Sequence, residues 1–155
     1  SPRLFKTVWE GMKFYTRGVT GYVDVKDVVR AMTLLMDDTF FENCKNQRFL
    51  LNAENLSYQK IFSRISTALE KPEPKVYASP FMLGIAWRAA AFQSWLTGRQ
   101  PALTRETAAS SNRVKKFDGH KITRFVDFNY LPVNDSIKQT ASFLKQEMNK
   151  TKNQA

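Results

Sequence analysis

The chain has 155 residues, of which 43% are hydrophobic and 20 are aromatic, so it is long enough for one domain with a real core and too apolar to be disordered. Lysine and arginine outnumber aspartate and glutamate by 24 to 14, which gives a net charge of +10 and a pI near 9.9. This balance raises the hypothesis of a nucleic-acid partner. However, the basic residues are spread along the chain, and no Arg/Lys-rich helix or RNA-binding aromatic motif accompanies them.

The cysteine count and the apolar stretches indicate the compartment. The single cysteine, Cys44, cannot form an internal disulfide, which suits a reducing cytoplasm. The longest apolar stretch, SPFMLGIAWRAAAF, is short and contains Arg88, and the opening residues lack the uninterrupted apolar core of a signal peptide. We therefore expect a cytoplasmic protein without a membrane partner. Because the sequence begins without methionine, we also expect it to be a piece of a longer protein.

Apolar spacing and turn residues predict alternating elements along the chain. The first half of the chain is predicted to contain a helix over 4–12, a glycine-containing turn and strand over 13–25, a helix over 25–36, a polar connection over 35–47 and a short strand over 48–54. Asp24 is the expected N-cap of the helix over 25–36, with Asp27 as the acidic member of a capping box. A helix capped by Ser57 follows, with Ile61, Phe62, Ile65 and Leu69 on one face.

The second half is predicted to contain an extended stretch over 75–80, a helix over 80–96 stopped by Gly98, a short helix from Thr104 to Ala109, an extended stretch over 113–117 and a short helix opened by Asp118. The last helix has Ile137, Ala141, Leu144 and Met148 as its buried stripe.

Tyr22 and Lys26 have the Tyr-x-x-x-Lys spacing that many short-chain dehydrogenases use for proton transfer. That chemistry requires both residues on one helix, so that the lysine can lower the pKa of the tyrosine. Here Tyr22 lies in the alternating run GYVDV, which is typical of a strand, and the helix begins only afterwards. We therefore predict that this spacing is accidental.

The predicted helix over 80–96 is unusual for a small domain. It carries large apolar residues on nearly every side, so a domain of this size has too little other surface to cover it, and a missing partner surface would explain the pattern. The strands are also few, short and widely separated, which is more typical of a region attached to an α/β enzyme than of a self-contained sheet.

Three segments, RGVTGYVDVKDVVRAMTLLM, RFLLNAENLSYQKIFSRISTALEK and PALTRETAASSNRVKKFDGHKITRFVDFNYLPVNDSIKQTASFL, follow one another in a characteristic order. Together they resemble the C-terminal half of an extended short-chain dehydrogenase/reductase of the NAD-dependent epimerase/dehydratase family. Residues 21–28, 50–57 and 118–132 carry the resemblance, which spans residues 4–147. It implies an α/β, mostly helical substrate-binding region of a Rossmann-type enzyme over residues 1–147, with few short strands, followed by a basic polar tail over 148–155.

The family places its Gly-rich cofactor loop and its catalytic Tyr-x-x-x-Lys in an N-terminal nucleotide-binding half. No such glycine-rich loop is present here, and the segment with Tyr22 and Lys26 aligns instead with a later Gly-x-Val-Asp-Val element of the family, so the catalytic pair is missing too. The resemblance therefore implies that the parent enzyme uses NAD or NADP, that this chain alone binds neither and is inactive, and that its partners are the missing half and a small-molecule substrate. Truncation would also favour a homo-oligomer or a non-native oligomer.

Departures from the family indicate the branch. Nucleotide-sugar epimerases tend to have an arginine where this chain has Thr20, and an Arg-x-Gly-Asp that is absent before the segment at Asp118. The chain is more similar to the dihydroflavonol-reductase-like branch, whose substrates are often less charged, although Arg17 or Arg113 could compensate. Epimerase, dehydratase and reductase all remain open as activities of the parent.

Five residues are candidate substrate contacts. Tyr15, Arg17 and Thr20 flank a glycine turn that faces the substrate cleft in this family, Phe81 could line that cleft, and Arg113 could meet an anionic group. We predict no metal site, because His120 is the only histidine, and no nucleophilic role for Cys44, because it has no paired histidine nearby in sequence. The rival hypothesis is a non-enzymatic basic module that binds nucleic acid or a protein partner through the helix over 80–96.

Overall fold

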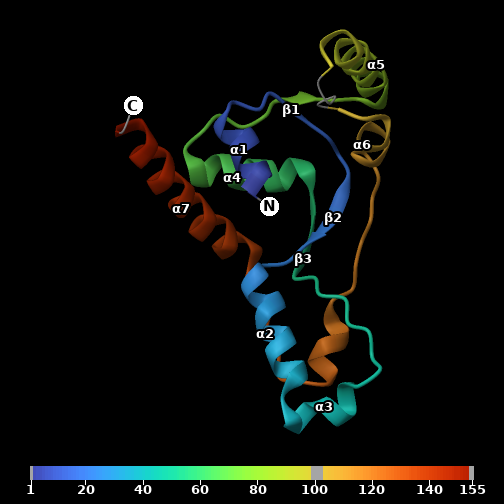
Figure 1. The fold of residues 1–155 in the computed structure, drawn as a ribbon, viewed down its shortest axis with the longest axis vertical. Coiled ribbons are helices and arrows are strands. Elements are labelled where there is room, and N and C mark those ends of the chain that lie inside the picture. The colour runs from blue at the N-terminus through green and yellow to red at the C-terminus, as the bar shows by residue number, and fades with distance from the viewer. Residues whose placement is uncertain (1, 99–102, 154–155) are drawn as a thin grey trace.

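Helices make up most of the chain, and the strands are few and short (Figure 1). The structure, a computed structural model, describes residues 2–98 and 103–153. The elements are α1 Pro2–Trp9, β1 Phe14–Tyr15, β2 Val19–Tyr22, α2 Val25–Met36, α3 Asp38–Cys44, β3 Glu54–Ser57, α4 Tyr58–Leu69, β4 Val76–Tyr77, α5 Pro80–Thr97, α6 Arg105–Ser110, the 3-10 helix η1 His120–Arg124 and α7 Val133–Asn153. The predicted class, a mostly helical α/β fold with few short strands, is confirmed at this level.

The strands form two separate two-stranded sheets. β1 pairs with β4 in parallel, and β2 pairs with β3 antiparallel, with Thr20 opposite Leu56. A parallel bridge from Val19 to Val114 adds the predicted extended stretch over 113–117 beside β2. These short pairings join segments that are far apart in sequence, so they fix where α4, α5 and α6 lie relative to one another.

The main core lies between α1, α4 and α7. The stripe predicted for α4 is buried here, because its apolar residues recur at the spacing that places them on one helix face. On α7 the predicted stripe is buried at its start, partly buried at Leu144, and exposed at Met148. The core comprises Phe5, Val8, Leu56, Ile61, Phe62, Ile65, Leu69, Val133, Ile137 and Ala141.

A second, smaller cluster lies at the other end of the molecule, between α2, α3 and η1 (Figure 1). α2 contributes Ala31 to it, while Val25, Val29 and Met32, which recur at helical spacing, are exposed. Asp24 caps the helix as predicted, accepting a hydrogen bond from the backbone N–H of Lys26.

Asp27 does not complete a capping box. Its buried carboxylate instead accepts a 2.8 Å hydrogen bond from the backbone N–H of Leu131 and one of 3.0 Å from Nη2 of Arg30. This carboxylate therefore ties α2 to the segment that precedes α7. The spacing to Asp24 indicated a local role for Asp27, whereas the structure gives it a long-range one.

Two predicted segments are wrong. Residues 35–47, expected as a polar connection, contain α3, which the side chain of Asp37 caps by accepting a hydrogen bond from the backbone N–H of Thr39. The strand expected over 48–54 is irregular until Glu54, where β3 begins. Phe49 and Leu51 still pack inward and Leu50 is exposed, as in a strand, but no strand of the described chain lies beside them to pair with their backbone.

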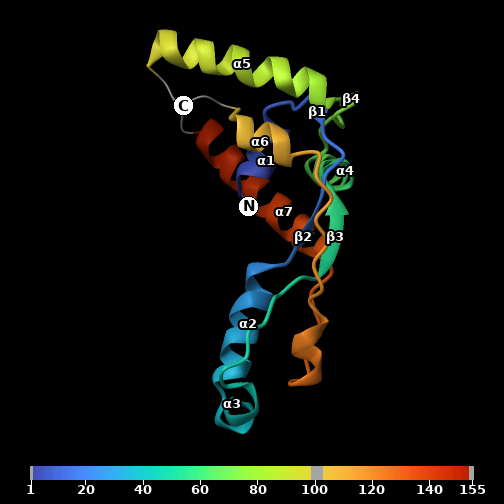
Figure 2. The ribbon, with the colours of Figure 1, turned by 90° about the vertical axis from the view of Figure 1, so that its right-hand side faces the viewer.

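α5 lies along one edge of the molecule, as Figure 2 shows from the side, and α6 packs beneath it. The hydroxyl of Ser79 caps the start of α5 at Pro80, and Gly98 stops the helix as predicted. None of its residues is buried. Across the described residues, no helix combines the length and the hydropathy needed to cross a membrane.

Candidate functional site

An apolar cavity of about 300 Å³ lies between β1 and helices α4, α5 and α6. Its walls are mostly apolar, with a few hydroxyl groups from Thr16, Tyr58, Thr107 and Ser110. A concave apolar site with a few polar groups is the usual form of a small-molecule pocket, and this volume is at the lower end of the usual range. The full lining is Met12, Phe14, Tyr15, Thr16, Tyr58, Phe62, Ala78, Leu83, Leu103, Thr107, Ser110 and Ser111.

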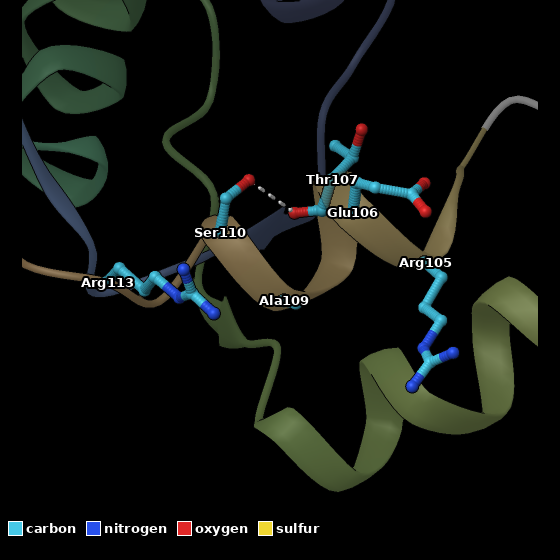
Figure 3. A pocket seen from close by; sticks show the side chains of 6 residues that line it. All are labelled: Arg105, Glu106, Thr107, Ala109, Ser110 and Arg113. Carbon is cyan, nitrogen blue, oxygen red and sulfur yellow. Dashed lines mark hydrogen bonds between the residues drawn. The ribbon is translucent and has the colours of Figure 1, made fainter.

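A second hollow, of about 550 Å³, runs along α6 and adjoins the first (Figure 3). Thr107 and Ser110 line both, so the two hollows meet at this helix. Arg105 and Arg113 lie at opposite ends of α6, and neither guanidinium has a hydrogen bond or ion pair with another described side chain. The pair of hollows therefore offers an apolar chamber next to two available positive charges.

The sequence between Ser111 and Lys115 holds Arg113 in place by pairing with β2. The backbone N–H of Gly18 donates to the carbonyl of Ser111 at 3.1 Å, and that of Val19 donates to the carbonyl of Arg113 at 3.0 Å. A Cβ at Gly18 would lie only 2.3 Å from the Ser111 carbonyl oxygen, so only glycine allows the two segments to approach this closely.

Asn112 connects the turn before β2 with β4. Its Oδ1 accepts a 3.1 Å hydrogen bond from the backbone N–H of Arg17 and a longer one, 3.5 Å, from the hydroxyl of Tyr77. The Arg17 guanidinium carbon lies 4.3 Å from the centre of the Tyr77 ring, which in turn packs against the ring of Tyr15. Arg17 is therefore engaged in a structural contact with Tyr77.

The five predicted substrate contacts lie in different places. Tyr15 lines the apolar cavity and Arg113 lines the adjoining hollow, so the structure brings these two to the same site. Arg17 stacks on Tyr77, Thr20 lies half-buried in β2 opposite Leu56, and Phe81 is 77% exposed on α5. Neither hollow has any of these last three in its lining.

Several lining residues were not singled out from the sequence. Thr107, Ser110 and Ser111 lie three and four positions apart on the short helix that Thr104 caps, so a polar face of α6 could have been recognised. Tyr58 and Phe62 line the cavity from the edge of a helix whose apolar face indicated only core packing. No sequence pattern indicated a binding role for Arg105, because exposed arginines are common in a basic chain.

Tyr22 and Lys26 do not form a catalytic pair. Tyr22 ends β2 and Lys26 lies in α2, where its Nζ donates to Oε1 of Gln139 at 2.7 Å. Burial, and to a lesser extent the nearby Tyr58, raises the pKa of the Tyr22 hydroxyl above its ordinary value, the opposite of what a general base near neutral pH requires.

His120 and Cys44 lie apart from the hollows. His120 is exposed, and its Nδ1 lies 2.8 Å from Oδ1 of Asp118, whose pKa is lowered chiefly by a hydrogen bond from the backbone N–H of His120. Cys44 is buried in α3. Among the described residues, no cluster of three or more histidine, cysteine, aspartate or glutamate side chains could hold a metal ion.

No protein-family model matches the chain, and no curated protein matches it. Its fold is similar to that of the crystal structure of gox2253, with a TM-score of 0.68 over 94% of this chain at 20% sequence identity. The chain covers 43% of gox2253, which is less than half the length of that protein. This likeness shows a shared fold and leaves the finer family assignment as a prediction.

Proposed function

We propose that this chain is the substrate-binding part of an NAD(P)-dependent epimerase, dehydratase or reductase that resembles the extended short-chain dehydrogenases. The observation that carries the proposal is the apolar cavity of about 300 Å³ that adjoins the hollow containing Arg105 and Arg113. A pocket that is mostly apolar and has a few convergent polar groups is suited to hold and orient a small molecule.

The lining suggests the chemistry of the substrate. The apolar body of the molecule would occupy the cavity beside Tyr15, and a carboxylate or phosphate would reach Arg113 or Arg105 along α6. Hydroxyl groups of Thr107 and Ser110, which line both hollows, would bind polar groups between these ends. This agrees with the resemblance to a branch whose substrates carry less charge than a nucleotide sugar.

Two features support a docking surface for a nucleotide-binding half. Val25, Val29, Met32 and Met36 recur at three- and four-residue spacing and form an exposed apolar stripe along α2. Residues 48–51 alternate like a strand but have no neighbouring strand in the described chain. A further sheet edge beside this segment would pair its backbone, and a further helix would cover α2.

The N-termini of α2, α4 and α5 are not arranged to bind the pyrophosphate of a dinucleotide. α2 begins behind the carboxylate of Asp24, which would repel a pyrophosphate, and the N-termini of α4 and α5 are capped by Ser57 and Ser79. No glycine-rich turn precedes any of these helices. The proposal therefore assigns cofactor binding and acid/base groups to another part of the enzyme, and substrate binding to this part.

The test compares this chain with a longer chain in which the upstream coding region is restored. Titration with NAD and with NADP should give no binding to the 155 residues alone, and binding with cofactor-dependent turnover in the longer chain. Tight dinucleotide binding by these residues alone would contradict the division of labour.

A variant of the longer chain tests the cavity itself. Thr107→Trp places a large ring where the two hollows meet, so KM should rise while dinucleotide affinity stays unchanged. Thr123→Trp is the matched control, since Thr123 is also exposed but lies in η1, away from both hollows. Equal effects of the two substitutions would show that the cavity does not bind substrate.

A further inference from the structure

The outward face of α5 carries large apolar side chains that nothing in the described chain covers. Leu83 and Trp87 turn toward α6, where they line a small hollow with Ala108. Helical spacing places a different set on the opposite side, and each member is more than half exposed. This set, the outer face of α5, consists of Phe81, Ile85, Phe92, Trp95 and Leu96. In Figures 1 and 2 no element lies beyond this side of the helix.

The part of the chain that contains α5 is also its most basic part. Residues 75–116 hold seven lysines and arginines and one acidic residue, whereas the rest of the chain holds seventeen basic and thirteen acidic residues. Arg105 lies against α5, as its place in the hollow with Pro80 and Trp87 shows. Positive charge beside an apolar face is complementary to a surface that is both apolar and negatively charged.

Arg88 limits the kind of partner that fits. It lies midway along the helix, and helical spacing places it within the outer face, with its guanidinium carbon 4.7 Å from the centre of the Trp87 ring and Nη1 donating to the carbonyl of Gly84 at 2.7 Å. An apolar protein surface laid over this face would bury the charge without a carboxylate partner, which is costly. At a lipid surface the long side chain can extend to the phosphate groups while its neighbours insert among the acyl chains.

We propose that α5 docks peripherally on an anionic lipid surface through its outer face. The helix is about 27 Å long, and a charge at its midpoint would lie deep in the hydrocarbon if the helix stood upright, so the helix lies parallel to the surface. Phe81, Phe92 and Trp95 enter the boundary between head groups and acyl chains, and Arg88 contacts the lipid phosphates. This contradicts the expectation of no membrane partner drawn from the sequence.

Sedimentation with lipid vesicles tests the proposal. The chain should bind vesicles that contain phosphatidylglycerol, bind vesicles of phosphatidylcholine alone several-fold more weakly, and lose affinity as salt is raised. The fluorescence of Trp95 should shift to shorter wavelength on binding, because this exposed indole would leave water.

Two matched substitutions locate the contact. Phe92 and Phe143 are 62% and 65% exposed, on α5 and α7 respectively, so replacing either with serine removes a similar exposed ring without opening a core. Phe92→Ser should weaken vesicle binding by about tenfold or more, and Phe143→Ser should leave it unchanged. Arg88→Gln should weaken binding to the anionic vesicles by about fivefold and hardly affect binding to neutral ones.

Three results would overturn the proposal. The first is no binding to anionic vesicles. The second is equal weakening by the two phenylalanine substitutions, which would place the contact elsewhere. The third is Phe92-dependent self-association in sedimentation velocity without lipid binding, which would assign the outer face of α5 to a second copy of the chain.

Discussion

α4 and α5 are both rich in apolar residues, yet they behave as opposites. α4 has 12 residues, and Ile61, Phe62, Ile65, Ser66 and Leu69 are buried against α1 and α7. α5 has 18 residues and buries none. The difference lies in the arrangement of the apolar residues, because α4 confines them to one side that two neighbouring helices cover, whereas α5 distributes them all round and has α6 on one side only.

A high content of apolar residues therefore does not by itself make a helix stabilise this domain. A side chain contributes through burial, so the stability of the described chain should depend strongly on α4 and weakly on the outer face of α5. The apolar residues of α5 are then available for contacts outside the chain. Four predictions test this contrast.

The largest difference is expected between two isoleucines. Ile65 on α4 is 1% exposed, and Ile65→Ala should lower the free energy of unfolding by about 2–5 kcal/mol through lost burial and a residual cavity. Ile85 on α5 is 56% exposed, and Ile85→Ala should change the free energy of unfolding by less than about 0.5 kcal/mol. Urea unfolding measures both, and similar losses would show that α5 is part of the stabilising core.

Gly18 contacts both the start of α4 and the segment that follows α6, so its substitution should disturb both. Its carbonyl accepts a 2.9 Å hydrogen bond from the backbone N–H of Tyr58 at the start of α4, and its other side meets the Ser111 carbonyl just after α6. Gly18→Ala should cost about 1–3 kcal/mol, because the new Cβ cannot fit 2.3 Å from that oxygen. Amide hydrogen exchange should increase at Val19 and Lys115, whose backbone N–H groups hydrogen-bond across this junction. Unchanged exchange there would contradict the close approach.

Substituting a glycine within α5 by alanine should raise stability, the opposite of the effect expected at Gly18. Gly84 is half-buried inside the helix, and a Cβ there would meet only the end of the Arg88 side chain, at 3.5 Å. Gly84→Ala should therefore stabilise the chain by up to about 1 kcal/mol through helix propensity alone. Thermal unfolding measures the gain, and a loss would show tighter packing around α5 than the structure has.

The smallest effect concerns an exposed ion pair between α4 and α7. Nζ of Lys145 donates to Oε1 of Glu70 at 2.8 Å, and this contact holds the pKa of the Glu70 carboxyl below its ordinary value. A lowered pKa in the folded state contributes stability above the pKa of the unfolded state, and this stability is lost as pH falls through the folded pKa. Lys145→Gln should therefore shift the urea midpoint slightly downward at pH 7 and by less at pH 3, whereas Lys138→Gln on the same helix should show no such pH-dependent loss. A loss that persists at pH 3 would exclude the ion pair as its cause.

Local signals in the sequence predicted much of the fold. Asp24, Ser57 and Thr104 cap helices where their side chains and the following apolar spacing indicated, and Gly98 ends α5. Each of these signals depends on interactions within a few residues of the chain. The same is true of the separation of Tyr22 from Lys26, since a strand and the following helix can be recognised from adjacent residues.

Apart from α3, whose cap Asp37 is a local signal, the failures involve partners that are distant in sequence. The 48–53 segment has the alternation of a strand, but a strand also needs a neighbouring strand to pair with, and residues 48–51 have none in the described chain. α2 presents Val25 and Met32 outward and buries Asp27, because the segment at Leu131 supplies a backbone donor that no local pattern reveals. The candidate site depends even more on such contacts. Tyr15 and Arg113 were recognised singly, but only the β2 contact at Gly18 brings α6 against the turn and creates the cavity.

The sequence alone therefore predicted most of the helices, several of their caps and an apolar α5 too large for a small domain to cover. The tertiary structure decided which faces are buried, where the two hollows meet, and that the outer face of α5 stays exposed. The physical reason is the distance along the chain over which each kind of interaction acts. Capping and helical spacing involve neighbours along the chain, whereas burial and cavities arise only when segments such as 14–19 and 105–115 come together.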